Sequence, residues 1–243
     1  LLYQSAAAEN ADIAVCGFYR IEDGTGKKLT TEMADERQPF DAQQTPARLL
    51  ELNGAPWNKI FRASLLKNLP DLPHPPRIFD DMMMHLLTYP NVNRVSFTPH
   101  ALVYYIIRDN SIMTTINTEQ LNSTYQAMLG VKDSYRQQHA SKGLMDFLAA
   151  AAFLHFGISL MFRMSYDPHA NMPELLKQNR TYLNEHFPTW KDGFILSLSN
   201  ALRYGKAVRK TWFMRLAYKA HLMNLALKLY RFMIEKTGKD IKW

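Results

Sequence analysis

Two adjacent carboxylates, Asp80 and Asp81, are the side chains of this sequence best suited to acid–base chemistry. They follow Phe79 in the segment RIFDDM (residues 77–82) and open a stretch that predicts a short helix up to Tyr89. A carboxylate at the start of a helix is oriented by free backbone N–H groups and by the helix dipole. So placed, it could take a proton from a hydroxyl group as a general base. The alternative is that both side chains only cap the helix.

Two more clusters contain residue types that bind ligands. Residues 53–62 read NGAPWNKIFR, and residues 104–113 read YYIIRDNSIM. An indole face suits the C–H face of a sugar, an amide can bond to hydroxyl groups, and a guanidinium fork suits phosphate oxygens. The structural alternative places Trp57 in the core, Lys59 on the surface and Arg108 in a surface salt bridge.

In this order and at this spacing, the three clusters resemble the family 2 glycosyltransferases of the GT-A type, especially bacterial enzymes that build capsular and other surface polysaccharides. That family commonly has a Pro-Trp-Asn-Lys-aromatic-Arg segment, then a Glu-Asp pair that opens a helix, then a Tyr-Tyr-aromatic-Arg segment with Ser-Ile a few residues on. Residues 2–18 also resemble the helix and strand that follow the family's Asp-x-Asp segment. The resemblance covers roughly residues 1–115, and three motifs in order are more specific than any one of them.

The resemblance implies roles for individual residues. Asp81 matches the family's base. Asp80 stands where the family usually has Glu, which keeps the charge but shortens the side chain. The remaining candidates for substrate binding are Trp57, Asn58 and Lys59 on the acceptor side, Arg108 at the donor diphosphate, and Ser111.

The same resemblance implies that part of the enzyme lies outside this chain. The family's first strands, nucleotide pocket and metal-binding Asp-x-Asp would precede Leu1. We therefore expect a piece, inactive by itself, of an enzyme that transfers a sugar from a nucleotide-sugar donor to a glycan or lipid-linked acceptor. A divalent cation, Mn²⁺ or Mg²⁺, would be bound mainly by the other half. The alternative function is that of a non-enzymatic helical module that docks on a membrane or a partner.

We expect both strands and short helices up to about Asn117, and only helices after it. The predicted strands are residues 12–21, 27–31, 92–98 and 101–107, and short helices are predicted at 47–52 and 80–89 around a proline-rich loop at 69–77. Long helical patterns follow at 118–139, 141–164, 173–187, 189–204 and 206–236. The expected fold class is α/β, with an incomplete GT-A domain over residues 1–117 and an all-helical region over residues 118–243.

The composition is that of a globular protein with a buried core. Hydrophobic residues make up 47% of the chain and charged residues 21%. The apolar run at residues 147–162 contains His155 and is short for a membrane span, so we expect a buried helix. Cys16 is the only cysteine, and the eight histidines lack metal-ligand spacing. These counts exclude a disulfide framework and a cysteine-rich metal site.

Positive charge is concentrated near the C-terminus. Residues 201–243 contain eleven Lys and Arg against two Asp and Glu, giving +9, whereas residues 1–200 contain 18 against 20, giving −2. From Lys206 to Lys236, basic residues are mixed with Trp212, Phe213 and many leucines. Such a segment can lie on an anionic bilayer, or it can be a solvated face over a core. We expect a cytoplasmic enzyme that contacts the inner face of the membrane through this segment. No recognised nucleic-acid-binding module supports a nucleic-acid partner.

Overall fold

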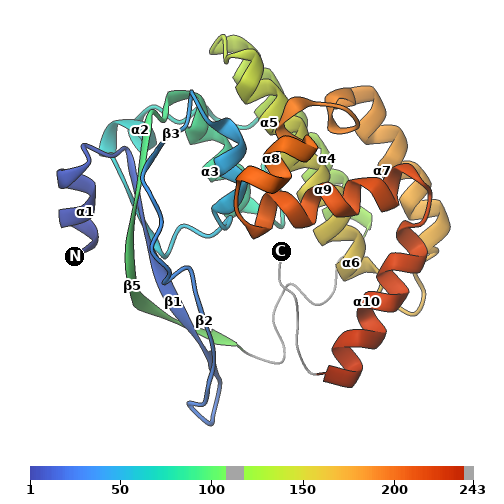
Figure 1. Ribbon diagram of the computed structural model, residues 1–243. Helices are drawn as coiled ribbons and strands as arrows, with labels where there is room; N and C mark the ends of the chain where they lie inside the picture. Colours follow the sequence, from blue (N-terminus) through green and yellow to red (C-terminus); the bar gives the residue numbers. More distant parts are fainter. Residues whose placement is uncertain (108–117, 238–243) are drawn as a thin grey trace. The chain divides into compact units, whose positions relative to one another are not determined.

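The computed structural model describes residues 1–107 and 118–237 (Figure 1). These residues form two compact units. The first, called here the sheet unit, comprises residues 1–46, 53–107 and 119–141, and the second, the helical unit, comprises residues 47–52, 118 and 142–237. The sequence predicts a domain boundary near Asn117. In the structure the helix that follows Asn117 belongs to the sheet unit, which extends to residue 141.

A mixed five-stranded sheet is the centre of the sheet unit. Its strand order is β2-β1-β5-β3, and β4 pairs with β1. β1 runs parallel to β5 and antiparallel to β2 and β4, and β3 runs antiparallel to β5. The strands are β1 (Ile13–Glu22), β2 (Lys28–Glu32), β3 (Phe40–Asp41), β4 (Lys59–Phe61) and β5 (Arg94–Ile107).

The prediction of two strands at 92–98 and 101–107 is wrong, because β5 is continuous from Arg94 to Ile107. Cys16 of β1 pairs with Thr98 and Gly17 pairs with Ala101, so Pro99 and His100 form an irregularity inside one strand. A proline is tolerated at such an irregularity, where the ladder does not need its missing N–H group. The predicted strand at 12–21, its turn and the returning strand are confirmed by β1 and β2.

The helices of the sheet unit are α1 (Leu2–Ala8), α2 (Ala63–Lys67), α3 (Asp80–Thr88), the 3₁₀ turn η2 (Tyr89–Asn91) and α4 (Thr118–Gln137). α3 buries Met82, Met83, His85 and Leu86, so two of its three methionines fill the core. The hydroxyl of Tyr135 on α4 donates to the carbonyl of Leu86 at 2.9 Å. This buried hydrogen bond ties α4 to α3, which is why α4 belongs with the sheet.

One long apolar helix forms the core of the helical unit. It consists of α5 (Lys142–Ala152), the π-helical segment η4 (Phe153–Leu160) and α6 (Met161–Met164). In the described part of the chain this is the one helix long and apolar enough to cross a membrane, and 83% of its apolar window is buried inside the protein. Burial of this extent is typical of a core helix, as the sequence predicts. The other elements are η1 (Pro46–Glu51), α7 (Met172–His186), η5 (Pro188–Trp190), η6 (Phe194–Leu196), α8 (Leu198–Arg203), α9 (Lys206–Lys219) and α10 (Met223–Thr237).

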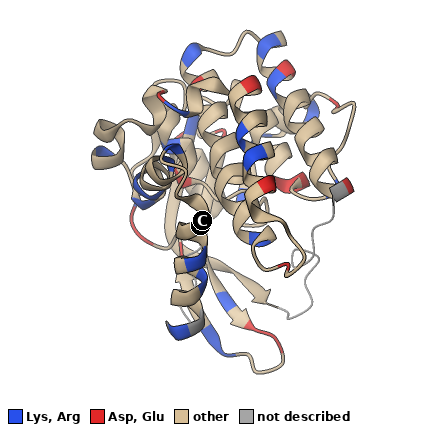
Figure 2. Cartoon of the chain, turned by 90° about the vertical axis from the view of Figure 1, so that its right-hand side faces the viewer, with Lys and Arg blue, Asp and Glu red and all other residues tan. Residues whose placement is uncertain are grey.

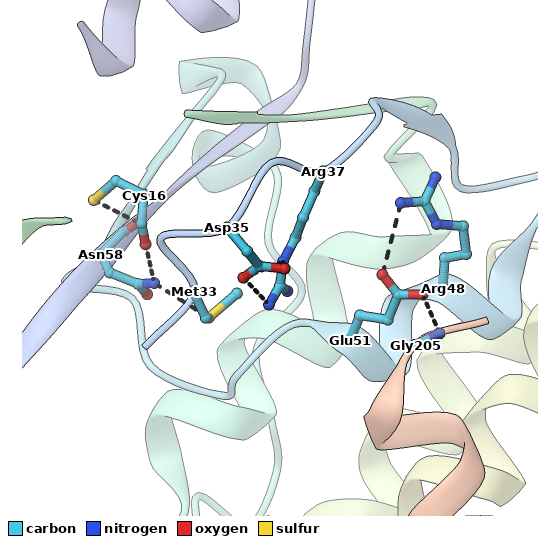
Figure 3. Close-up of polar contacts among 8 residues, drawn as sticks. All are labelled: Cys16, Met33, Asp35, Arg37, Arg48, Glu51, Asn58 and Gly205. Atoms are coloured by element: carbon cyan, nitrogen blue, oxygen red, sulfur yellow. Dashed lines mark hydrogen bonds and ion pairs between the residues drawn. The ribbon is translucent and has the colours of Figure 1, made fainter. Parts of the chain in front are cut away.

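Three helix predictions in this unit need correction. The helix after Thr45 is a 3₁₀ helix, η1, whose Glu51 accepts a hydrogen bond from the backbone N–H of Gly205 at 3.2 Å (Figure 3). The helix predicted at 189–204 is two 3₁₀ turns followed by α8, because the Ser197 side chain accepts from the backbone N–H of Asn200 and starts a new helix there. The helix predicted at 206–236 is divided into α9 and α10, with His221 between them in the left-handed region at φ 61°.

Candidate active site

Asp80 and Asp81 occupy the first two positions of α3, and both side chains are exposed. The N-cap residue is Phe79, not an aspartate, and its side chain makes no capping hydrogen bond. Phe79 has φ 63°, a left-handed backbone conformation that is rare for a bulky residue and is found more often at functional sites. Within residues 1–107 and 118–237, neither carboxylate forms a hydrogen bond or an ion pair with another residue. Both aspartates therefore lie exposed at the start of α3.

The surroundings of Asp81 make it a stronger base than an ordinary aspartate. Partial burial raises the pKa of Asp81, and the negative charge of Asp80 raises it further, while the positive charge of Lys59 opposes the rise. Two neighbouring carboxylates resist full ionisation because like charges repel. A carboxylate with a raised pKa holds a proton more readily, which suits a general base.

Lys59, at the start of β4, is buried and points its ammonium group at oxygen atoms of its own loop. Its Nζ donates to the Asn53 carbonyl at 3.0 Å, to the Ala55 carbonyl at 2.6 Å and to Oδ1 of Asn58 at 2.9 Å, and it also contacts Oδ1 of Asn53. Burial lowers the pKa of Lys59 to about 7, and the negative charge of Asp81 opposes this effect. Lys59 is therefore the centre of the 53–59 loop and an electrostatic neighbour of Asp81.

The same loop packs directly on the start of α3. A Cβ placed on Gly54 would lie 3.4 Å from the Cβ of Met82, the residue that follows Asp81. At Gly54 the loop thus lies against the end of α3 that carries the two aspartates. The structure joins two clusters that are separated by about twenty residues in the sequence.

Asn58 is completely buried and bonds to protein atoms on every side. Its Nδ2 donates to the Cys16 carbonyl at 2.8 Å and lies 3.7 Å from the sulfur of Met33 (Figure 3). Its Oδ1 accepts from Lys59 at 2.9 Å. Its backbone carbonyl accepts from the backbone N–H of Cys16 at 3.0 Å. In this geometry Asn58 attaches the loop to β1 and orients Lys59, and it presents no atom at the surface for a sugar.

Trp57 is 37% exposed and belongs to an aromatic cluster on one face of the sheet. Its ring stacks on Tyr105 of β5 with centroids 5.0 Å apart and an interplanar angle of 11°, and it meets the edge of Phe18 at 4.8 Å. The guanidinium of Arg20 lies 5.5 Å from the centre of the Tyr105 ring and also pairs with Glu32. The parallel register pairs Arg20 with Tyr105, so both side chains extend from the same face.

Sequence reasoning missed Phe18, Arg20 and Tyr105 as possible site residues. Alternation along residues 12–21 indicates that Phe18 and Arg20 share a face of a strand, but not which strand lies beside it. The pairing of β1 with β5, about eighty residues away, brings these side chains to Trp57. Arg108 and Ser111 lie outside the described residues.

Arg62, the last residue of the first motif, has a structural role. Its Nε pairs with Asp12 at 2.8 Å, and its amino group donates to Oδ1 of Asn10 at 2.9 Å. The other carboxylate oxygen of Asp12 accepts from the backbone N–H of Asn93 at 2.8 Å and of Arg94 at 3.1 Å. Together these bonds hold the starts of β1 and β5 and the end of β4 in place.

Residues 1–107 and 118–237 contain no group of three or more His, Cys, Asp or Glu side chains placed to hold a metal ion. Asp80 and Asp81 are two carboxylates at one place, which is fewer ligands than an all-protein metal site uses. We therefore assign no metal-ion step to these residues.

Comparison with known proteins identifies a shared fold. No protein-family model matches the chain, and no curated protein matches it in sequence. Two crystal structures of S. aureus TarS, residues 1–349, match in structure at 15% sequence identity. The TarS complex with UDP has a TM-score of 0.55 over 99% of this chain and 62% of the TarS chain. The complex with UDP-GlcNAc has a TM-score of 0.58 over 99% of this chain and 64% of the TarS chain.

These similarities define a glycosyltransferase-like fold for the chain, at the level of architecture. The chain spans less than two thirds of the length of the TarS chains that it matches. The TarS structures themselves contain a nucleotide or a nucleotide-sugar.

Proposed function

We propose that this chain is the acceptor-side part of a family 2 glycosyltransferase of the GT-A type. The enzyme would transfer a sugar from a nucleotide-sugar donor to a glycan or lipid-linked acceptor in the synthesis of a surface polysaccharide or capsule. The observation that carries the proposal is the environment of Asp81, an exposed carboxylate at the start of α3 whose pKa is raised by partial burial and by Asp80. The glycosyltransferase-like fold and the order of the three motifs support it.

The reaction assigns one chemical step to Asp81. The acceptor hydroxyl attacks the anomeric carbon of the donor sugar, the bond from that carbon to the nucleotide diphosphate breaks, and the diphosphate leaves with the electron pair. Asp81 takes the proton of the hydroxyl as the new bond forms. Asp80 assists by raising the basicity of Asp81, and Lys59 limits that rise.

Acceptor binding is assigned to the aromatic cluster around Trp57. An indole that is held by Tyr105 and Phe18 and is still partly exposed offers a fixed apolar surface to the C–H face of a sugar. Asn58 attaches the Trp57 loop to β1 and Lys59 bonds to oxygens of the loop, so their contribution to acceptor binding is made through the loop. In the same proposal, Arg108 contacts the donor diphosphate and Ser111 lies close to the substrate.

The donor pocket and its divalent cation, Mn²⁺ or Mg²⁺, are assigned to residues outside this chain. The order of the three motifs supports this division, because in the family that they resemble the nucleotide pocket and the Asp-x-Asp segment come earlier in the chain. UDP-GlcNAc, which is present in one of the TarS complexes, is the first donor to test.

The test is sugar transfer by the protein that includes the residues upstream of Leu1. The assay measures release of nucleoside diphosphate and transfer of labelled sugar to candidate acceptors, with a panel of nucleotide-sugars and with Mn²⁺ or Mg²⁺. We expect turnover with at least one donor and its loss in Asp81→Asn. Turnover that is unchanged in Asp81→Asn would remove Asp81 as the base. Absence of turnover with every donor and acceptor would overturn the enzymatic function.

A further inference from the structure

The outer face of α10 is apolar, although it is exposed to solvent. Leu222, just before the helix, and Leu225, Leu229 and Phe232 within it are between 52% and 61% exposed. Their spacing places them on one side of the helix, where they form a continuous stripe. This outer stripe is defined here as Leu222, Leu225, Leu229 and Phe232.

The opposite side of α10 packs on the protein. Met223 and Leu227 are buried, and the Tyr230 ring lies 4.7 Å from the Phe162 ring of α6. Arg231 donates to the carbonyl of Ser165, and its guanidinium lies 4.6 Å from the centre of the Tyr166 ring. The apolar residues of α10 therefore form two faces, and only one of them is used by the core of the helical unit.

The segment that contains the outer stripe is rich in basic residues. From Lys206 to Lys236 the sequence contains eight Lys and Arg and a single acidic residue. Figure 2 draws the Lys and Arg of the chain in blue. Lys228 and Lys236 are exposed on α10, and α9 exposes Phe213 and Leu216 together with Lys206 and Arg209. A surface helix that only covers a core normally exposes polar side chains to solvent. α10 instead exposes leucine and phenylalanine side chains next to lysines.

We propose that the outer stripe of α10, with Lys228 and Lys236 beside it, docks on an anionic lipid bilayer. An exposed apolar helix face with flanking lysines is the pattern by which helices lie in the interface of a membrane with anionic headgroups. The apolar side chains enter the headgroup–acyl boundary, and the lysines pair with lipid phosphates. Nucleic acid is a poorer fit, because the stripe is aliphatic at three of four positions and bases stack on aromatic rings. This inference does not depend on the proposed sugar transfer.

The experiment is cosedimentation of the 243-residue chain with vesicles of phosphatidylcholine alone and with increasing phosphatidylglycerol. Binding should rise with phosphatidylglycerol and fall as salt screens the lysines. The double variant Lys228→Gln/Lys236→Gln should weaken the partition coefficient about 25-fold, because each lysine near an anionic surface contributes about fivefold. Leu229→Gln/Phe232→Gln should remove the binding that persists in high salt. Arg231 is left unchanged because it anchors α10 to Ser165.

Matched controls carry the same chemical changes elsewhere. Leu202→Gln alters a leucine of α8 that is 72% exposed, and Lys67→Gln/Lys177→Gln removes two exposed lysines from α2 and α7. Both controls should bind like the unchanged chain, and circular dichroism should show the same melting curve for every variant.

Three outcomes would overturn the proposal. The first is equal recovery with neutral and anionic vesicles, or recovery with neither. The second is binding that survives both the lysine and the stripe substitutions. The third is a dimer in analytical ultracentrifugation that dissociates in Leu229→Gln/Phe232→Gln, which would assign the outer stripe to a second copy of the chain.

Discussion

Lys59 connects the two halves of the candidate site at the scale of single residues. It is held by oxygens of Asn53, Ala55 and Asn58, and its charge acts on Asp81. The basicity of Asp81 is thus controlled by two neighbours of opposite sign, Asp80 and Lys59. Substitutions at Asp81, at Trp57 and at Lys59 should therefore have distinct and measurable effects.

The first prediction is that Asp81→Asn, in the protein that includes the upstream residues, lowers kcat by a factor on the order of 10² to 10⁴. Asparagine keeps the shape but cannot accept the proton. Asp80→Asn should cost less, and it should shift the acidic limb of the kcat profile to lower pH, because removing its charge lowers the pKa of Asp81. If Asp81→Asn folds normally and its kcat stays near that of the unchanged enzyme, Asp81 is not the base. The two aspartates then only stabilise the start of the helix.

The second prediction concerns acceptor affinity. Trp57→Ala removes a ring that stacks on Tyr105, and we expect the KM for the acceptor to rise about three- to tenfold, the size of one aromatic contact. Trp57→Phe keeps an aromatic face and should retain most of the affinity. Steady-state kinetics with each substrate varied in turn provides the check. An equal rise in the KM for the donor would place Trp57 outside the acceptor side.

The third prediction is a pH dependence of stability that originates in Lys59. Burial lowers its pKa to about 7, whereas in the unfolded chain it returns to the ordinary value of 10.5. Between these values the unfolded state holds the extra proton, so the free energy of unfolding should increase as pH rises above 7, by at most about 1.4 kcal/mol per pH unit.

Urea unfolding from pH 7 to about 8 tests this slope, since the cysteine and the tyrosines of the unfolded chain titrate mainly at higher pH. Lys59→Met serves as the reference, because it deletes the titrating group. The free energy of unfolding should rise more steeply with pH in the unchanged chain than in Lys59→Met. A difference of zero would mean that Lys59 stays protonated in the folded protein through its contacts with the loop oxygens.

At the scale of elements, the core helix of the helical unit depends on its π-helical segment. Phe153 begins this segment, and its ring stacks on Trp190 at 4.9 Å and meets the edge of the Tyr218 ring at 5.3 Å. Gly157 lies directly beside the same ring, because a Cβ at this position would be 2.7 Å from Cδ2 of Phe153. The glycine is therefore required by packing and not by backbone conformation.

The fourth prediction is that Gly157→Ala destabilises the protein by about 1 to 3 kcal/mol through overpacking. Helix propensity alone gives the opposite sign, since alanine in a helix is favoured over glycine by roughly 1 kcal/mol. The sign of the change in urea unfolding therefore decides between the two effects. The double variant Gly157→Ala/Phe153→Leu, in which the crowded ring is absent, should lose less stability than the sum of its single changes. Stabilisation by Gly157→Ala alone would show that Phe153 can move away.

For the whole molecule, activity is proposed to require sequence beyond this chain. The fifth prediction is that the 243-residue chain by itself does not turn over nucleotide-sugars, because its donor pocket and metal ligands are assigned elsewhere. Purified chain is incubated with Mn²⁺ or Mg²⁺ and a panel of donors, and nucleoside diphosphate release is measured. Correct folding is verified in the same sample by its melting curve. Robust turnover by this chain alone would contradict the proposed division of the active site.

Local patterns in the sequence determine much of the sheet unit. β1 and β2 follow from alternating β-branched and aromatic residues around the turn at Gly24 and Gly26, both of which have positive φ. The start of α3 at Asp80 is likewise recognisable from its neighbours. These features can be predicted because turn residues, strand alternation and helix starts act over a few positions.

Only the tertiary structure decides which side a given residue faces. Asn58 looks like a ligand-binding residue in the sequence, yet it is buried between Lys59 and Cys16. Phe18 and Tyr105 reach Trp57 through the pairing of two strands that lie about eighty residues apart in the chain. The same holds for α10, where leucines of identical type are divided between a buried face and an exposed one. Residue type and spacing define the faces of an element, but burial depends on partners distant in the sequence, and these are brought together only when the chain packs.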